Sequence, residues 1–260
     1  MKKININNRK GQKIVFLLEE ADNPKGLAFV MHGLGGFKEQ PQIIAFAEAF
    51  KEKGFTVVRF DTTNTYGESD GEFADATTTN YLADLEDVIS WASNQPWYLE
   101  PFYLAGHSLG SFCIILYAEE HADKVKGLAP ISTVVSGKLS LESPKLKETL
   151  KDWEKTGWRE EKSESVPGLV KKLKWSHVID RNKYNVIPKA NKLTMPILLV
   201  AGDKDDSTPI EHQKILFEAI PSKKKELHVI KEAPHTFLDP KQISEVKGHL
   251  LKWIDSSEDN

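Results

Sequence analysis

The 260-residue chain contains one cysteine, so an internal disulfide framework is excluded. This residue, Cys113, stands among Phe112, Ile114 and Ile115, and we expect a packed core thiol there, not a nucleophile. No apolar run is long enough for a membrane helix, and the charged N-terminus lacks the apolar stretch of a secretion signal. These absences favour a cytoplasmic protein with no membrane partner.

The 35 basic and 38 acidic residues nearly cancel, so the chain has no strong overall charge of either sign. Because nucleic acids attract proteins largely through positive charge, this balance predicts no nucleic-acid partner. The 8 histidines are scattered, and none stands in a metal-binding spacing such as HExxH. We therefore expect no metal and no cofactor, and the sequence specifies no oligomeric state.

Short apolar segments alternate with segments of helical periodicity along most of the chain. Residues 2–18 have the alternation and the central turn of a β-hairpin. Apolar runs typical of buried strands lie at Leu27–Met31, Phe55–Phe60, Phe102–Ala105, Val125–Ile131, Ile197–Ala201 and Leu227–Ile230. Helical spacing is found at Gln42–Lys53, Tyr81–Trp91, Ser111–Glu120, a segment reaching Leu216–Ile220, and Ile243–Ile254. This order predicts a single α/β domain over residues 1–260, with a mostly parallel eight-stranded sheet and helices on both faces.

The alternation stops near Ser132. Residues 136–192, approximately, are strongly charged and carry Trp153, Trp158 and Trp175. Several short amphipathic helices fit this composition, and no buried strand does. We expect a helical insertion over the carboxyl edge of the sheet, whose tryptophans need apolar partners.

The pentapeptide Gly106-His107-Ser108-Leu109-Gly110 lies between a predicted strand and a predicted helix. In so tight a turn, the serine at the apex has a strained backbone and its hydroxyl is pushed clear of the sheet. A Cβ at either glycine would collide with the neighbouring strand or helix. Because the helix starts at the serine, the Leu109 amide is a free donor for an oxyanion. For this motif alone, an ordinary turn with a solvated serine is the alternative.

A glycine-rich stretch, His32-Gly33-Leu34-Gly35-Gly36, follows the strand at 27–31. It lacks the GxGxxG order of a dinucleotide site and the Lys-Ser/Thr of a phosphate loop. What it offers is a second backbone donor, the Leu34 amide. We expect His32 and His107 to position the two glycine-containing loops.

An acidic loop and a histidine follow the last two predicted strands. The loop at residues 202–209 carries three acids, of which only one can face a histidine: Asp203, Asp205 and Asp206. Parallel strands bring their carboxyl ends to one edge of a sheet, so we expect Ser108, one of these acids and His235 to meet there. The histidine would serve as a base and the carboxylate would orient it. Asp205 is the preferred acid, and Asp203 is its main rival.

Four motifs, in this order along the chain, resemble those of the α/β-hydrolase superfamily: His32-Gly33, Gly106–Gly110, Gly202–Pro209 and His235. The resemblance runs from about residue 10 to about residue 255, and it implies the α/β-hydrolase fold with the insertion in the position of a lid. In that family the acid loop has the pattern Gly-x-x-Asp-x-x-x-Pro, which places the acid on Asp205.

A second stretch, Arg59–Phe73, is similar to small bacterial serine esterases, including the cinnamoyl/feruloyl-esterase-like branch. Those enzymes usually carry Arg-Gly-His or a similar sequence in this loop, where this chain has Thr62-Thr63-Asn64-Thr65-Tyr66. The loop lies near the mouth of the site in the family, so the difference concerns the substrate.

These observations predict a carboxylesterase-like serine hydrolase that works through an acyl-enzyme. The predicted nucleophile, base, orienting acid and two oxyanion donors are Ser108, His235, Asp205 and the amides of Leu34 and Leu109. The expected partner is a small-molecule ester, whose acyl or aromatic group would contact three lid residues, Trp153, Trp158 and Trp175. Thioesterases, lipases, peptidases and non-catalytic ligand-binding proteins share the scaffold, so each is a competing interpretation.

Overall fold

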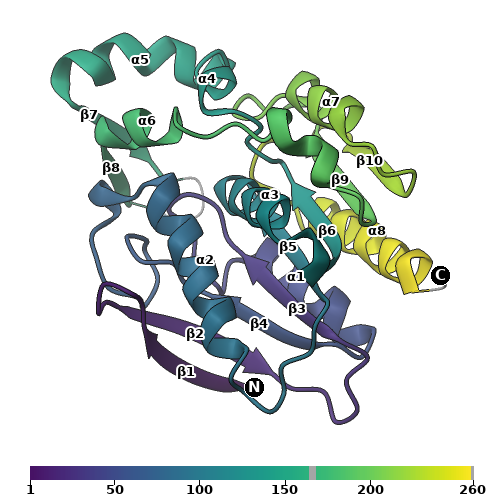
Figure 1. Ribbon diagram of the computed structural model, residues 1–260. Coiled ribbons are helices and arrows are strands. Elements are labelled where there is room, and N and C mark those ends of the chain that lie inside the picture. Colours follow the sequence, from purple (N-terminus) through teal and green to yellow (C-terminus); the bar gives the residue numbers. More distant parts are fainter. Residues whose placement is uncertain (164–167, 259–260) are drawn as a thin grey trace.

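The computed structural model of the chain describes residues 1–163 and 168–258 and is built on an eight-stranded sheet (Figure 1). The strands follow the order β1-β2-β4-β3-β5-β6-β9-β10 across the sheet. Their bounds are β1 Lys2–Asn7, β2 Lys13–Glu19, β3 Leu27–Met31, β4 Thr56–Phe60, β5 Phe102–His107, β6 Val125–Ile131, β9 Ile197–Gly202 and β10 Lys225–Ile230. The β1–β2 and β2–β4 pairs are antiparallel, and the other neighbouring pairs are parallel. The predicted sheet, with its N-terminal hairpin, is confirmed.

Each face of the sheet carries its own hydrophobic core. Along β3, Leu27, Phe29 and Met31 belong to one core and Ala28 and Val30 to the other. Successive side chains of a strand point to opposite faces, so a strand that is apolar at every position must be covered on both sides. All five residues of β3 are fully buried accordingly.

Helices provide this cover on both faces, as predicted (Figure 1). Their bounds are α1 Pro41–Glu52, α2 Thr78–Ala92, α3 Leu109–Glu120, α7 Ile210–Ala219 and α8 Pro240–Glu258, with short 3₁₀ turns η1 Phe73–Asp75 and η2 Ala122–Lys124. Side chains of α1 and α8 share one core, which contains Phe46 and Leu250. Side chains of α2, α3 and α7 share the other core, which contains Leu85, Phe112 and Leu216.

The insertion between β6 and β9 is only partly helical. It comprises α4 Gly137–Ser140, α5 Pro144–Thr156, β7 Trp158–Lys162, β8 Val170–Lys174, α6 Ser176–Arg181 and the 3₁₀ turn η3 Ile187–Lys192. The expectation of helices alone is corrected, because β7 and β8 form an antiparallel hairpin. Half or more of the residues of β7 are exposed, and its Glu160 lies opposite Lys172 of β8, with 2.7 Å between the charged atoms. The hairpin therefore lacks the apolar alternation that marks a strand in the sequence.

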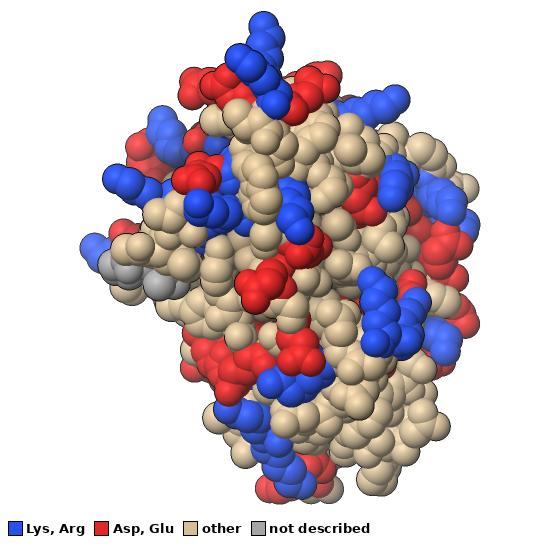
Figure 2. Space-filling model, turned by 90° about the vertical axis from the view of Figure 1, so that its left-hand side faces the viewer, with Lys and Arg blue, Asp and Glu red and all other residues tan. Residues whose placement is uncertain are grey.

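Charged side chains of both signs intermingle on the face shown in Figure 2. Lys and Arg often stand beside Asp and Glu there, in keeping with the near balance of charge in the sequence. Within residues 1–163 and 168–258, none of the helices combines the length and the apolar character needed to cross a bilayer.

Candidate active site

Ser108 lies in the turn between β5 and α3, with a strained backbone. Its φ of 54° and ψ of −116° fall where an L-residue is rarely found. The flanking glycines make the turn possible: a Cβ on Gly106 would lie 2.8 Å from the Ser111 nitrogen, and one on Gly110 would overlap the His32 carbonyl. The predicted strand–turn–helix is therefore present, with the serine at its apex.

The structure brings Ser108, His235 and Asp205 into one hydrogen-bonded line. The His235 Nε2 atom lies 2.8 Å from Ser108 Oγ, and its Nδ1 atom lies 2.9 Å from Asp205 Oδ2. The acid follows β9 and the histidine follows β10, so both reach the carboxyl edge of the sheet where β5 also ends. Since a carboxylate only accepts, Nδ1 carries the proton and Nε2 is free to accept from the serine hydroxyl.

Asp205 is buried and held by its own loop. Its Oδ1 atom accepts from the amides of Ser207 (2.9 Å) and Thr208 (2.7 Å), and its Oδ2 atom accepts from the Thr208 hydroxyl (2.8 Å). Burial alone would raise the pKa of this carboxyl, but the His235 charge and the hydrogen bonds from His235 and Thr208 outweigh it and lower the pKa. The group is therefore an anion at neutral pH.

The two rival acids do not face the histidine. Asp203 and Asp206 are exposed, whereas Asp205 is buried with its side chain against His235. The choice of Asp205 over Asp203 agrees with this geometry. The sequence did not single out Thr208, although a hydroxyl three residues after an acid can donate a hydrogen bond to that acid in a turn.

The two expected oxyanion donors, Leu34 and Leu109, belong to segments that adjoin the serine. Leu109 is the first residue of α3, so its amide has no partner inside the helix. The glycine loop that carries Leu34 approaches closely, since a Cβ on Gly33 would lie 3.0 Å from the Ser108 Cβ. Leu34, Ser108 and Leu109 border the same cavity. Their role as oxyanion donors stays a prediction.

Two buried histidines hold the loops around the serine. His32 donates from Nδ1 to the Gly33 carbonyl (2.7 Å), and its Nε2 accepts from the Thr62 amide (3.1 Å). His107 donates from Nε2 to the His235 carbonyl (2.9 Å). Burial lowers the pKa of both rings, to about 3 for His107, where the His235 charge adds to the effect. His32 thus holds the glycine loop as expected, whereas His107 holds the loop of the base.

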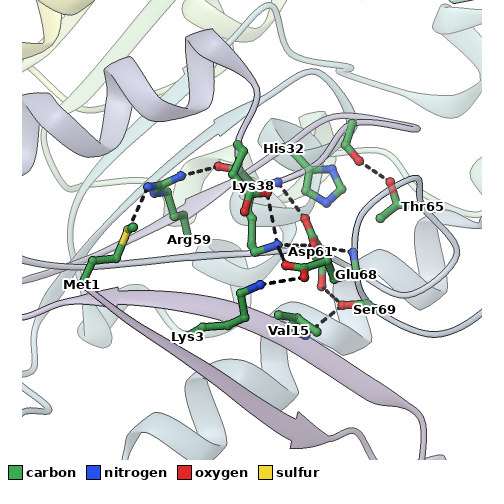
Figure 3. A network of polar contacts seen from close by, with 12 residues as sticks. Met1, Lys3, Val15, His32, Lys38, Arg59, Asp61, Thr65, Glu68 and Ser69 are labelled. Atoms are coloured by element: carbon green, nitrogen blue, oxygen red, sulfur yellow. Dashed lines mark hydrogen bonds and ion pairs between the residues drawn. The ribbon is translucent and has the colours of Figure 1, made fainter. Parts of the chain in front are cut away.

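A buried ion cluster anchors the segment between the glycine loop and α1 (Figure 3). The fully buried Lys38 Nζ lies 2.8 Å from Asp61 Oδ2 and 2.6 Å from Glu68 Oε2. The Lys38 amide donates to the other Asp61 oxygen (2.7 Å), and Arg59 donates to the Lys38 carbonyl (2.8 Å). Sequence reasoning missed this cluster; the available signal was Asp61, an acid placed directly after a buried strand.

A cavity of about 140 Å³ borders Ser108 and His235. The glycine loop and the start of α3 form one side of it, and Phe73 of η1 supplies an aromatic wall. The opposite side comes from the insertion, including Leu146 of α5 and Leu173 of β8. The insertion therefore helps to enclose the space in front of the serine.

None of the three predicted tryptophans is among the described residues that line this cavity, so that prediction is corrected. Trp153 is buried within the insertion, where its Nε1 donates to the Leu173 carbonyl (3.1 Å) and its ring contacts Trp175 (centroids 5.7 Å apart). Trp158 is 46% exposed. The indole rings of Trp153 and Trp175 supply the core that the insertion itself needs, which the count of tryptophans could not distinguish from a substrate wall.

The sheet order and the serine turn define a class, the α/β hydrolases. Est1E from Butyrivibrio proteoclasticus, solved with ferulic acid bound, has a TM-score of 0.82 and 24% identity, covering 99% of this chain and 100% of its own. Alpha/beta hydrolase domain-containing protein 10 from mouse has a TM-score of 0.79 and 21% identity, covering 98% of this chain and 99% of its own. At these identities the likeness concerns the fold.

Within this class, the model of the family described as "Serine aminopeptidase, S33" matches residues 22–160 and 172–242. The chain belongs to this family of hydrolases. A protein of Escherichia coli, described as an uncharacterized 31.7 kDa protein in the traX-finO intergenic region, is 27% identical over 256 residues, covering 87% of this chain and 88% of the relative. The predicted fold and the resemblance to α/β hydrolases are thereby confirmed.

Proposed function

We propose that the protein is a serine hydrolase that cleaves carboxylic esters through an acyl-enzyme. The observation that carries this proposal is the line of hydrogen bonds from Asp205 through His235 to Ser108, with 2.9 Å and 2.8 Å between the atoms. A serine hydroxyl is a weak nucleophile at neutral pH unless a base takes its proton. This arrangement supplies that base and holds it in the required tautomer.

In the proposed reaction, Ser108 Oγ attacks the ester carbonyl carbon while His235 Nε2 takes the hydroxyl proton. The carbonyl oxygen becomes an oxyanion that accepts from the amides of Leu34 and Leu109, and each such donor contributes roughly 3–4 kcal/mol of barrier lowering. The intermediate collapses as His235 returns the proton to the departing alcohol. Water then attacks the acyl-serine by the same steps, with His235 again as base and then as acid, and releases the carboxylic acid.

The cavity supports a small acyl or single-ring group next to the serine. Its volume of about 140 Å³ is close to the roughly 150 Å³ that holds a benzene-sized ligand in a protein interior. The insertion forms one wall of this space, so we propose that it acts as a lid that selects the group reaching Ser108. The presence of ferulic acid on Est1E, which has the same fold, is consistent with a site of this size.

A peptidase is the second candidate, and the observation that favours it is the family description, "Serine aminopeptidase, S33". Serine proteases and esterases use the same nucleophile and base, so the triad alone does not separate them. The same scaffold also supports thioesterases, lipases and non-catalytic ligand-binding proteins. Hydrolysis of aminoacyl anilides faster than of matched esters would favour the peptidase.

The test is turnover of a panel of p-nitrophenyl esters of increasing acyl length, beside thioesters and aminoacyl anilides. We expect hydrolysis of short acyl esters, and a loss of roughly 10⁶-fold in kcat on Ser108→Ala. Ser111→Ala is the matched control for a serine of the same turn that faces the backbone carbonyls of Gly106 and Ile131. A wild-type protein inert to every ester would overturn the proposal.

A further inference from the structure

Arg181, at the end of α6, is buried in the wall of the cavity that borders Ser108. Arg181 is only 7% exposed, and it lines the cavity together with Ser108. Among the described residues, no carboxylate lies within ion-pair distance of its guanidinium. A buried charge is costly unless something pairs with it, so an unpaired arginine in a cavity wall points to a partner that arrives with the ligand.

The partners that Arg181 does have are neutral. Its Nε donates to His177 Nε2 (3.1 Å), one terminal nitrogen donates to the same ring atom, and the other donates to Ser140 Oγ (3.3 Å). His177 in turn donates from Nδ1 to the Ala76 carbonyl (2.9 Å), which leaves Nε2 as an acceptor. Burial, followed by the charge of Arg181, lowers the pKa of this ring, so it is uncharged at neutral pH. These contacts orient the guanidinium without neutralising it.

The hydrogen-bond count of Arg181 leaves a fork for a ligand. A guanidinium has five N–H groups, and three are used by His177 and Ser140. One N–H remains on each terminal nitrogen, and a guanidinium can bind a carboxylate through one N–H of each terminal nitrogen. Burial, then the nearby Arg159 charge, lowers the pKa of Arg181 to about 10, so the group stays protonated at neutral pH.

Among the described residues that line the cavity, basic side chains outnumber acidic ones. The basic residues are Lys145, Arg159, Lys162, Lys171 and Arg181. Glu161 is the acidic residue among the described lining residues, and it already pairs with Lys145 (2.7 Å) and Arg159 (2.5 Å). The molecule as a whole carries a net charge of −3, so this excess of basic side chains in the described lining is not a consequence of composition.

We propose that the site selects esters that carry a carboxylate group, which pairs with the free fork of Arg181. This inference rests on the proposed function, since it names the substrate class of the same site. Arg181 is a specificity residue in this account: it touches the substrate away from the reacting carbonyl. The carboxylate can belong to the acyl part or to the alcohol part of the ester, and the experiment distinguishes the two.

The experiment compares esters with their neutral carboxamide analogues, which have nearly the same shape. Monoethyl glutarate and its carboxamide analogue place the group on the acyl side, and para-acetoxybenzoate and para-acetoxybenzamide place it on the alcohol side. Hydrolysis is followed by proton release, and the ratio of kcat/KM between the members of each pair is the readout. We expect the wild-type protein to prefer the carboxylate by about tenfold or more in one pair, the gain of a charge-assisted pair of hydrogen bonds. The pair of compounds that shows the preference identifies whether the carboxylate belongs to the acyl part or to the alcohol part of the substrate.

Variants assign this preference to Arg181. Arg181→Gln should bring the ratio close to one, and Arg181→Lys should retain only part of the preference because the paired N–H geometry is lost. Lys183→Gln is the matched control, since Lys183 is an exposed cation two residues further that pairs with Asp180 (3.1 Å) outside the cavity lining. No preference in the wild-type protein, or a preference that survives Arg181→Gln, overturns the inference. If Arg181→Gln does not fold, the wild-type ratio and the Arg181→Lys ratio decide.

Binding to the Ser108→Ala protein separates this inference from the proposed function. Calorimetry with monoethyl glutarate and para-acetoxybenzoate, beside their carboxamide analogues, needs no turnover. If the wild-type protein hydrolyses nothing yet the variant binds one carboxylate about tenfold more tightly, the proposed function fails and the anion site stands. If hydrolysis proceeds and neither the rate nor the binding favours a carboxylate, the function stands and the anion site fails.

Discussion

Ser108, His235 and Asp205 each owe their chemical character to a few neighbours at atomic distance. The serine is held in a strained turn, the histidine is fixed by hydrogen bonds on both ring nitrogens, and the acid is kept ionised by three donors of its own loop and the base. Strand order was enough to predict Ser108, His235 and an acid of the 202–209 loop, because parallel strands bring the residues that follow them to the same edge of the sheet. The acid-loop pattern of the resembled family then selected Asp205.

Replacing Asp205 or Asp203 by asparagine should have very different effects on kcat. Asp205→Asn should lower kcat by roughly 10⁴-fold with little change in fold, because an amide in place of the carboxylate favours the wrong histidine tautomer. Asp203→Asn, the exposed rival, should change kcat by less than about twofold. The check is steady-state kinetics on a short-chain ester. A larger loss of kcat from Asp203→Asn than from Asp205→Asn would show that Asp203, and not Asp205, is the orienting acid.

Other residues of the site belong to no motif that can be recognised in the sequence. Arg181 sits in a charged segment, and only the fold shows that His177 and Ser140 hold its side chain in a buried wall. The three tryptophans gave a strong signal for burial, but burial inside the insertion and contact with a substrate look alike in composition. Contacts between distant segments decide such cases, and no local pattern records them.

The helices and strands around the site show where local pattern is sufficient. The strands β3 and β6 have the predicted bounds, Leu27–Met31 and Val125–Ile131. In β3 a continuous apolar run specifies burial on both faces. The hairpin of β7 and β8 could not be predicted in this way. Its residues are mainly charged, with Glu160 opposite Lys172, and they form no apolar run that would mark a buried strand.

The loop between β3 and α1 depends on the buried Lys38. Lys38→Met should lower the free energy of unfolding by roughly 3–5 kcal/mol, because Asp61 would stay buried without its counter-charge. Urea unfolding followed by circular dichroism measures the change. Lys53→Met, which breaks the more exposed pair with Asp255, should cost less than about 1 kcal/mol. Equal costs for the two variants would show that the cluster does not anchor the loop.

Glu119 makes the stability of α3 depend on pH. Burial raises the pKa of Glu119 to about 8, and its Oε1 atom has no hydrogen-bond partner. The folded pKa lies above the ordinary value, so stability that is present below about pH 4–5 is lost as the pH rises towards 8. Glu119→Gln should therefore gain stability relative to wild type between about pH 5 and pH 9, on the order of 3 kcal/mol.

Thermal unfolding of both proteins across this pH range tests the point. Glu120→Gln is the control, since Glu120 is exposed and pairs with Lys189 (2.5 Å), and it should show no such gain. A difference between Glu119→Gln and wild type that stays constant with pH would mean that this carboxyl does not titrate in the range.

For the whole molecule, the proposed function depends on how the insertion is held against the sheet. Figure 1 places α4, α5, α6 and the hairpin together at one end of the molecule, with α6 next to α2. Asp180 of α6 accepts from both the amide (2.8 Å) and the hydroxyl (2.5 Å) of Thr79 at the start of α2. This contact joins the cavity wall to the sheet domain, and a carboxylate at a helix N-terminus adds to its strength.

Loosening this contact should affect substrate binding more than chemistry. Asp180→Ala should raise KM for a neutral ester by about fivefold or more and lower stability by roughly 1–3 kcal/mol, because the Thr79 groups lose their acceptor. The value of kcat should change less than KM. Asp152→Ala, which removes an exposed carboxylate of α5, serves as control. Unchanged KM and stability in Asp180→Ala would argue that the wall is held by other contacts.

Covalent labelling shows whether Ser108 is a nucleophile activated by His235. The protein is treated with a fluorophosphonate, its intact mass is measured, and the labelled peptide is mapped. We expect a single adduct per chain on Ser108, loss of ester hydrolysis in step with labelling, and no adduct in Ser108→Ala. An unlabelled wild-type protein, or an adduct on another residue with hydrolysis retained by Ser108→Ala, would contradict it.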